Sequence, residues 1–201
     1  TVTTGTDFAG NCRTWNHAAG EVVPTSLIVQ SNRDVREGDP ATWTTTFGHD
    51  SQLRRTKIVH PEGHRTDFDW SASWALTERR EKATDTDTDD NDEDLVWTYT
   101  HGSTWGMLED STDPEGNVTE RTLDSLERVT QIEYPTITHP TPDVTITESF
   151  SWNADGTLAT RTDGEGAVTD FDYYTSGAKT GLLWKVTRDY GTGKLNLVTE
   201  Y

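Results

Sequence analysis

The stretch that decides the fold is Leu108–Pro135, LEDSTDPEGNVTERTLDSLERVTQIEYP. Apolar residues and Thr alternate with charged residues along it, and a Pro114-Glu115-Gly116 turn interrupts the alternation. A period of two is typical of strands, because successive side chains point to opposite faces of a sheet. Proline fixes φ and glycine supplies φ > 0, as tight turns require. The stretch therefore predicts three short strands joined by two turns.

The Glu-Gly turn recurs, so the chain is a repeat protein. Glu-Gly pairs end at Gly63, Gly116 and Gly166, with spacings of 53 and 50 residues, and a weaker copy lies at Gly191–Gly193. An alternating run follows each of these turns. The spacings predict a basic unit of about 25 residues, with some copies degenerate.

The sequence before two of the turns also repeats. Phe47–Leu53 and Trp152–Leu158 each have an aromatic residue, Asp three positions later and Leu three positions after that. This Leu precedes the turn Gly by 10 residues in the first copy and by 8 in the later two copies. The difference predicts a β-bulge, or two extra residues, in the first copy.

These phrases resemble the YD-repeat, or RHS-repeat, family. The family phrase combines aromatic-Asp-x-x-Gly-x-Leu, Asp-Pro-x-Gly-Asn-x-Thr and Tyr-Asp-x-x-Gly-Arg. Asp113–Thr119 and Asn153–Leu158 match it closely, and Leu123–Thr130 matches with Leu123 in place of Tyr and Glu127 in place of Gly. The resemblance implies an all-β fold, in which tandem β-hairpins form a continuous curved sheet or β-solenoid.

The repeats define the expected organisation of the chain. Residues 1–40 are a poorly defined N-terminal β segment, and residues 41–201 carry the repeats, with an acidic loop insertion at 83–94. Ser73–Lys82 is the one helix-like stretch and fits an extended strand equally well. Because the chain begins and ends within the pattern, we expect it to be a piece of a longer protein.

Composition excludes several classes of function. The 201 residues carry a net charge of −18, which disfavours nucleic acid and anionic membrane surfaces as partners. Leu, Ile, Val and Phe number 35, yet 37 Thr and eight Trp favour half-buried strands over disorder. No window is apolar over eighteen residues, so no membrane insertion is expected, and the single Cys12 forms no internal disulfide. The acid excess fits a halophilic source or an ordinary acidic extracellular surface.

The acidic insertion is the candidate metal site. Asp85, Asp87 and Asp89 alternate along it, and hard carboxylate oxygens at this spacing could bind Ca²⁺. The EF-hand pattern is absent, because Asp90 and Val96 stand where that loop needs Gly and a bidentate Glu. The plainer interpretation is a solvated acidic loop.

No catalytic site and no bound cofactor are predicted. His60 and His64 flank one turn and could meet in a metal or acid–base site, although exposed turn histidines are the simpler interpretation. Asp113-Pro114-Glu115-Gly116 is similar to the self-cleavage motif of RHS shells, but Asn117 follows where that motif has an apolar residue. The Trp and Tyr rings could form a sugar-binding platform, or the packing core of the repeat.

The resemblance implies a non-catalytic structural segment of a secreted or cell-surface RHS/YD-repeat protein, part of a shell or scaffold such as a toxin shell. Its expected partners are neighbouring repeats of the same or a longer chain. The alternative is a repeat unit of an extracellular fibre or adhesin that self-assembles through edge strands. A sugar-binding or Ca²⁺-dependent binding protein is a third, more distant hypothesis.

Overall fold

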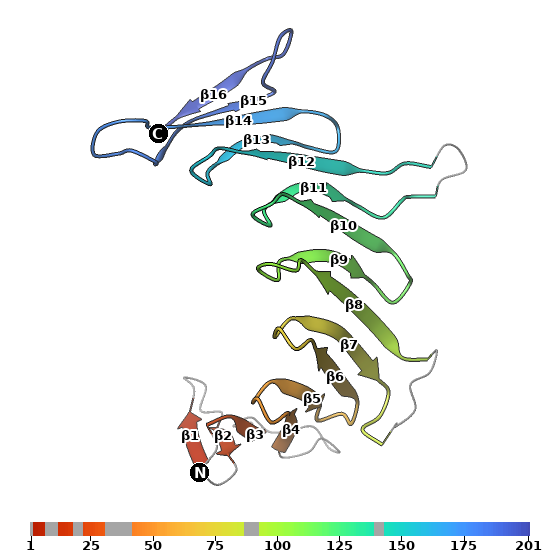
Figure 1. Cartoon of the computed structure of the whole chain (residues 1–201). Coiled ribbons are helices and arrows are strands. Elements are labelled where there is room, and N and C mark those ends of the chain that lie inside the picture. Colours follow the sequence, from red (N-terminus) through yellow and green to blue (C-terminus); the bar gives the residue numbers. More distant parts are fainter. Residues whose placement is uncertain (1, 7–11, 18–21, 31–41, 87–92, 139–142) are drawn as a thin grey trace. The chain divides into compact units, whose positions relative to one another are not determined.

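The structure is a computed structural model that describes residues 2–6, 12–17, 22–30, 42–86, 93–138 and 143–201. The described residues form antiparallel strands, turns and bends, and no helix, and the sheet order follows the chain order from β1 to β16 (Figure 1). This confirms the expected all-β fold of tandem hairpins. The strands are β1 (Val2–Thr6), β2 (Cys12–His17), β3 (Pro24–Gln30), β4 (Thr42–His49), β5 (Arg55–Val59), β6 (Arg65–Trp70), β7 (Leu76–Lys82), β8 (Leu95–His101), β9 (Leu108–Thr112), β10 (Val118–Leu123), β11 (Val129–Glu133), β12 (Thr147–Trp152), β13 (Leu158–Thr162), β14 (Val168–Tyr173), β15 (Leu183–Arg188) and β16 (Leu197–Glu200).

The chain divides into two compact units, Thr1–Thr98 and Tyr99–Tyr201. Unit 1 contains β1–β7 and most of β8, and unit 2 contains the end of β8 and β9–β16. The ambiguous stretch Ser73–Lys82 lies in unit 1, where β7 is a strand that pairs with β6 over six residue pairs. The predicted boundary between residues 40 and 41 stays a prediction.

Among the described residues, seven hairpin turns share one geometry. The N–H of the first residue donates to the C=O of the fifth, the N–H of the fourth donates to the C=O of the first, and the fourth residue has φ > 0. This is the three-residue hairpin loop with a residue in the left-handed conformation. The fourth residues are Leu53, Gly63, Trp74, Gly116, Glu127, Gly156 and Gly166.

The turns correct the repeat alignment made from sequence. Leu53 was matched with Leu158, which begins β13, but Leu53 is a turn residue with a φ of 64° and β5 begins at Arg55. Arg55 precedes Gly63 by 8 residues, as in the later copies, so the two extra residues do not exist. The pairing of β5 with β6 is regular, and the register shift of this region lies between Gly48 and His49, in the β4–β5 pairing.

The unit length follows from the same geometry. An uninterrupted hairpin, from the turn at Asp50 to the turn at Ser71, takes 21 residues. Each of the 53- and 50-residue spacings spans two hairpins, and one of the two has a longer connection between its strands, from Lys82 to Leu95 or from Glu133 to Thr147. The expected average of about 25 residues therefore combines a shorter unit with insertions.

Burial is shallow. Among the described residues, Val186 is the one hydrophobic side chain that counts as buried, whereas Arg65, Lys82, Asp94 and Glu127 are buried charged residues. The aromatic rings on strands are half-buried, which agrees with the expected packing role. Trp74 and Trp105, in turns, are 57% and 72% exposed, and so fall outside that core.

Candidate functional site

The acidic insertion is tied to unit 1 at its described start. Lys57 Nζ lies 2.5 Å from Asp85 Oδ1, and Arg65 Nη1 donates to the Asp85 carbonyl at 2.8 Å. The Asp85 N–H donates to the Gly63 carbonyl at 2.8 Å. Asp87 and Asp89, the other two calcium candidates, lie outside the described residues. The calcium site therefore stays a prediction, and its one described member already binds a lysine.

The described end of the insertion is held more deeply. Asp94 Oδ2 lies 3.3 Å from Lys82 Nζ and 3.1 Å from Arg80 Nη1, and the Asp94 and Lys82 side chains are 2% and 1% exposed. A buried charge is tolerated only when opposite charges or hydrogen bonds surround it. Both described ends of the insertion are thus bound by cations of β5–β7.

The predicted His pair does meet, but as a stack. The rings of His60 and His64 are 4.1 Å apart at their centroids and 13° from parallel, and His60 Nε2 lies 3.1 Å from Thr66 Oγ1. Burial, and then the charge of His64, lower the pKa of His60. Stacked rings direct their lone pairs side by side and not toward one point, so this geometry does not chelate a metal. Within the part of the chain that the structure describes, no group of three or more His, Cys, Asp or Glu could hold a metal ion.

The Asp113 turn has a structural explanation. Asp113 Oδ1 accepts the N–H of Asn117 at 2.9 Å, and Oδ2 accepts the Asn117 side-chain amide at 2.8 Å. The Asn117 side chain is the largest cause of the lowered pKa of Asp113. Both oxygens of this carboxylate therefore serve the turn, and Asn117, the residue that departs from the self-cleavage motif, is what binds them.

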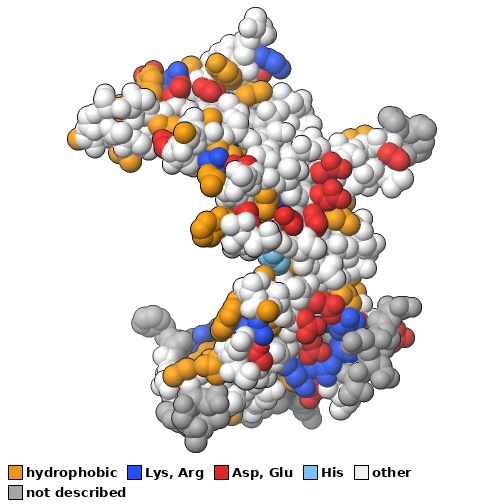
Figure 2. All heavy atoms as spheres, viewed as in Figure 1, with side chains coloured by type: hydrophobic (Ala, Val, Ile, Leu, Met, Phe, Trp, Pro, Cys, Tyr) orange, Lys and Arg blue, Asp and Glu red, His pale blue; other side chains and the backbone are white. Residues whose placement is uncertain are grey.

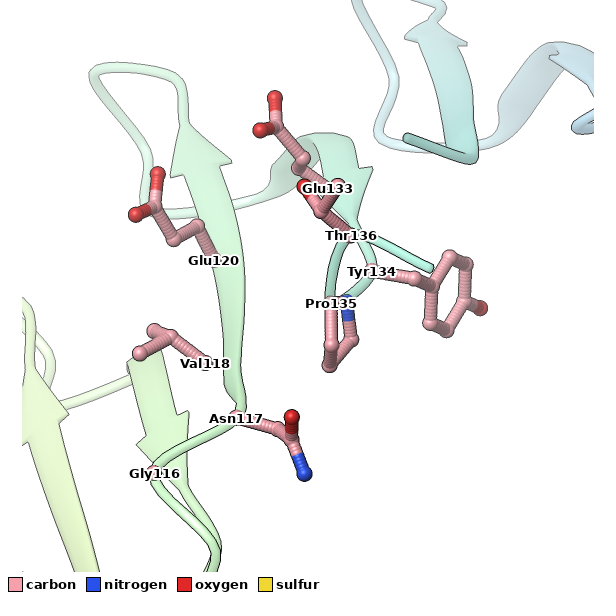
Figure 3. A pocket seen from close by; sticks show the side chains of 8 residues that line it. All are labelled: Gly116, Asn117, Val118, Glu120, Glu133, Tyr134, Pro135 and Thr136. Atoms are coloured by element: carbon pink, nitrogen blue, oxygen red, sulfur yellow. The ribbon is translucent and has the colours of Figure 1, made fainter. Parts of the chain in front are cut away.

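A polar cavity of about 260 Å³ lies beside the same turn (Figure 3). Glu120 of β10 pairs directly with Glu133 of β11 and with Asp110 of β9, which places three carboxylates in one row across three strands. The lining residues that the structure describes include Asn117 and Tyr134 but no His, Cys or Lys. The row is an acidic surface feature without a catalytic partner in the cavity.

In the part of the chain that the structure describes, two turns carry an Asp–Arg clamp, defined as Asp50 with Arg54 in unit 1 and Asp124 with Arg128 in unit 2. Asp50 Oδ1 accepts the N–H groups of Gln52 and Arg54, and Arg54 Nε donates to Asp50 Oδ2 at 2.6 Å. Arg54 Nη1 then donates to the carbonyl of Ser71, in the next turn on the same sheet edge, at 2.7 Å. The arginine thereby links one hairpin to the next.

The clamp of unit 2 repeats this geometry. Arg128 Nε donates to Asp124 Oδ2 at 2.7 Å, and Arg128 Nη1 donates to the carbonyl of Asn153, in the next turn of its edge, at 3.2 Å. Its guanidinium lies 5.5 Å from the ring centroid of Trp152. The hydrogen bond to Arg128 is the largest cause of the lowered pKa of Asp124. The sequence signal was Asp-x-x-x-Arg, which the family phrase covered only in unit 2.

Glu127 is the least expected residue of the unit 2 turn. It has a φ of 54° at a position where Gly is the usual residue, and it is 7% exposed. Its carboxylate accepts the N–H groups of Thr104 and Met107, in the loop between β8 and β9. Burial by itself raises the pKa of Glu127, but the backbone donors of Met107, Thr104 and Trp105 outweigh it and lower the pKa.

Beside Glu127 lies a cavity of about 580 Å³, named here the Trp105 groove. It is formed by the β8–β9 loop, the β10–β11 turn and the rim of β12. Trp105, Met107 and Leu126 are 72%, 48% and 59% exposed. Its lining residues are Trp105, Met107, Leu126, Glu127, Arg128, Val129 and Trp152. Sequence reasoning missed this groove, because it depends on which turns share a sheet edge.

No protein-family model matches the chain, and a search of curated proteins also gave no match. Within the described residues, no helix has the length and apolar character needed to cross a bilayer. The fold does match solved structures. The chain superimposes on TcdB2-TccC3 without its hypervariable C-terminal region with a TM-score of 0.62 and 14% identity, over 92% of this chain and 9% of that chain.

A second match is the Tc holotoxin pore of Photorhabdus luminescens with a TccC3 variant, at a TM-score of 0.61 and 14% identity, again over 92% and 9%. Another TcdB2-TccC3 structure gives 0.60 and 14%, over 90% and 9%. This chain thus spans less than a tenth of the chains it matches. At this identity the likeness concerns the fold alone: the chain has the fold of a short part of the TcdB2-TccC3 chains.

Proposed function

We propose that this chain is a non-catalytic structural segment of a secreted or cell-surface RHS/YD-repeat protein, where it forms part of a shell or scaffold. The Asp–Arg clamps carry this proposal. Arg54 and Arg128 each bind their own turn and the carbonyl of the next turn on the same edge. Each clamp therefore ties one hairpin to the next hairpin of the sheet.

The energetics of the sheet agree with this role. Each strand pairs with its sequence neighbours, and the cores of both units are thin. Stability in such an array is a sum of local hairpin terms and nearest-neighbour contacts, which suits a sheet that extends by adding units. The fold likeness to the TcdB2-TccC3 chains supports the same role.

The experiment is electron microscopy of the native parent protein, with mass measurement of the purified particles. Closed hollow particles that contain a longer chain support a shell. Protease treatment of intact cells, followed by immunoblotting, tests exposure at the cell surface. Hydrolytic or self-cleaving activity that depends on Asp113 in the purified protein would contradict the non-catalytic role.

A fibre or adhesin is the second candidate, and the end strands favour it. In the described sheet β1 and β16 each pair with one neighbour, and all their residues are exposed. An unpaired edge can accept a further strand from another chain. Filaments built from this chain in the same micrographs would support this candidate and contradict the shell.

Calcium binding at the acidic insertion is a separate proposal. Asp85, Asp87 and Asp89 would supply carboxylate oxygens, with Asp85 exchanging Lys57 for the ion. Thermal melting in Ca²⁺ or in EGTA tests it. A Tm that rises with Ca²⁺ but not with Mg²⁺ supports the proposal, and equal Tm values contradict it.

A further inference from the structure

We propose that the Trp105 groove is a docking site for a polypeptide segment that carries a large apolar side chain flanked by Lys or Arg. The proposal goes beyond the scaffold role and does not depend on it, because the groove lies entirely in unit 2.

The groove has the composition of a protein-binding site. Trp, Met and Arg are enriched at interfaces, and Trp and Arg dominate among the residues that contribute most to binding. A single exposed hydrophobic residue is ordinary, but here Trp105, Met107 and Leu126 border one cavity of about 580 Å³. Its volume falls within the roughly 300–1,000 Å³ of typical ligand pockets. Hydrophobic and acidic side chains lie next to each other on the surface over β9–β11 (Figure 2).

Glu127 fixes the loop that presents Trp105 and Met107. It occupies the left-handed backbone region, where glycine stands in four other turns of the described residues, and its carboxylate binds the N–H groups of Thr104 and Met107. A side chain at Gly102 would collide with this carboxylate, at 2.6 Å from Glu127 Cδ. A strained residue whose buried charge organises an exposed loop is typical of functional sites. The loop is thus held in position before a partner arrives, which lowers the entropy lost on binding.

Arg128 forms a wall of the groove and is not available to an anionic ligand. Its Nε and Nη2 bind Asp124 at 2.7 and 2.6 Å, and its Nη1 donates to the carbonyl of Asn153. The guanidinium is held near the face of Trp152. An acidic partner would therefore gain little from this cation.

Charge selects the flanks of the partner. Unit 2 holds seventeen carboxylates and seven Lys or Arg, a net charge of −10. Glu109 and Asp110 lie within three residues of Met107, a groove member, along the chain. Such a field attracts cationic segments and slows the approach of nucleic acid or anionic lipid. A large apolar side chain fits the cavity, and Lys or Arg on both sides of it complement the acidic surroundings.

The test uses the full 201-residue chain and a fluorescein-labelled heptapeptide with a central Leu-Phe-Leu and two Lys at each end, titrated by fluorescence anisotropy. The same centre with Glu ends, and Lys ends with a central Ser-Ser-Ser, are the control peptides. We expect Trp105→Ala to weaken binding of the Lys-flanked peptide at least about tenfold. Trp74→Ala, which removes an exposed Trp in unit 1, should change binding by less than about twofold.

Glu127→Gly is the second variant, because glycine suits the turn while the loop loses its anchor. We expect this variant to stay folded, as measured by circular dichroism. We also expect it to bind the Lys-flanked peptide more weakly, although Trp105 is still present. Equal binding of the Glu-flanked or Ser-centred peptide, equal losses in Trp74→Ala, or no binding up to about 1 mM peptide would overturn the proposal. Self-association in sedimentation velocity that disappears in Trp105→Ala would overturn it in favour of a second copy as occupant.

Discussion

The buried pair of Lys82 and Asp94 allows the sharpest prediction of stability. Their side chains are 1% and 2% exposed and 3.3 Å apart, so Asp94→Asn removes a carboxylate from a nearly inaccessible ammonium group. Breaking a buried pair from one side costs about 3–5 kcal/mol, because the remaining charge stays desolvated. The lost contact between Asp94 and Arg80 adds less to this cost, because Arg80 is 17% exposed and also binds Glu78 at 2.8 Å.

The assay is thermal unfolding followed by Trp fluorescence, with hydrogen exchange to localise the loss to β7 and β8. In a unit of this size, 1 kcal/mol corresponds to about 4–8 °C, so Asp94→Asn should lower the Tm of unit 1 by at least about 12 °C. The double variant Lys82→Met/Asp94→Leu should recover most of this loss, because apolar residues carry no desolvation cost. Glu148→Gln is the matched control, as its partner Arg161 is 45% exposed, and it should cost no more than about 1 kcal/mol. A fall of less than about 3 °C for Asp94→Asn would refute the reasoning.

Three further predictions concern the turns. Arg128→Lys should destabilise unit 2 by about 1–2 kcal/mol in urea unfolding, because lysine cannot bind Asp124 and the next turn together, whereas Arg161→Lys should have little effect. Gly116→Val should cost about 1–3 kcal/mol, because Gly116 has a φ of 83°, whereas Gly5→Val, in β1, should be nearly neutral; equal effects would contradict the backbone explanation. The lowered pKa of His60 means that the unfolded chain binds the proton more tightly, so stability falls as pH drops below the ordinary value of 6.5. Melting between pH 7.5 and 5.5 should show this loss, with a smaller slope in His60→Gln.

The sequence predicted the strands well, because Thr-rich alternation survives in every repeat. Glu-Gly pairs marked turns at Gly63, Gly116 and Gly166, where positive φ excludes most side chains. It missed the turns whose left-handed residue is Leu53 or Trp74, because nothing in those side chains indicates the conformation. Because the turn at Leu53 was missed, the first repeat was aligned two residues out of register with the later copies.

The functional features depend on contacts across the sheet edge, which composition does not encode. Arg128 reaches a carbonyl 25 residues away, and Glu127 reaches back 23 residues to Thr104. From the sequence, Glu127 was recognised only as a departure from the family phrase. The departure has a physical cause, because a glycine there could not anchor the loop that carries Trp105. The informative positions were therefore those, such as Glu127, at which a repeat departs from the shared sequence pattern.

The dependence of the Tm on salt concentration should distinguish two explanations of the acidic composition. Asp110, Glu120 and Glu133 lie directly opposite one another on adjacent strands, where like charges destabilise, and the whole chain carries −18. Melting in KCl should therefore give a Tm that rises with salt, with a smaller slope in the double variant Glu120→Gln/Glu133→Gln. Screening is nearly complete at 1 M, where the Debye length is about 3 Å. A Tm that levels off below that concentration indicates an ordinary acidic surface, while a continued rise indicates that the carboxylates work by binding ions and water, as a halophilic source would require. A Tm that falls with salt would mean that the Asp–Arg clamps and buried pairs outweigh the repulsion.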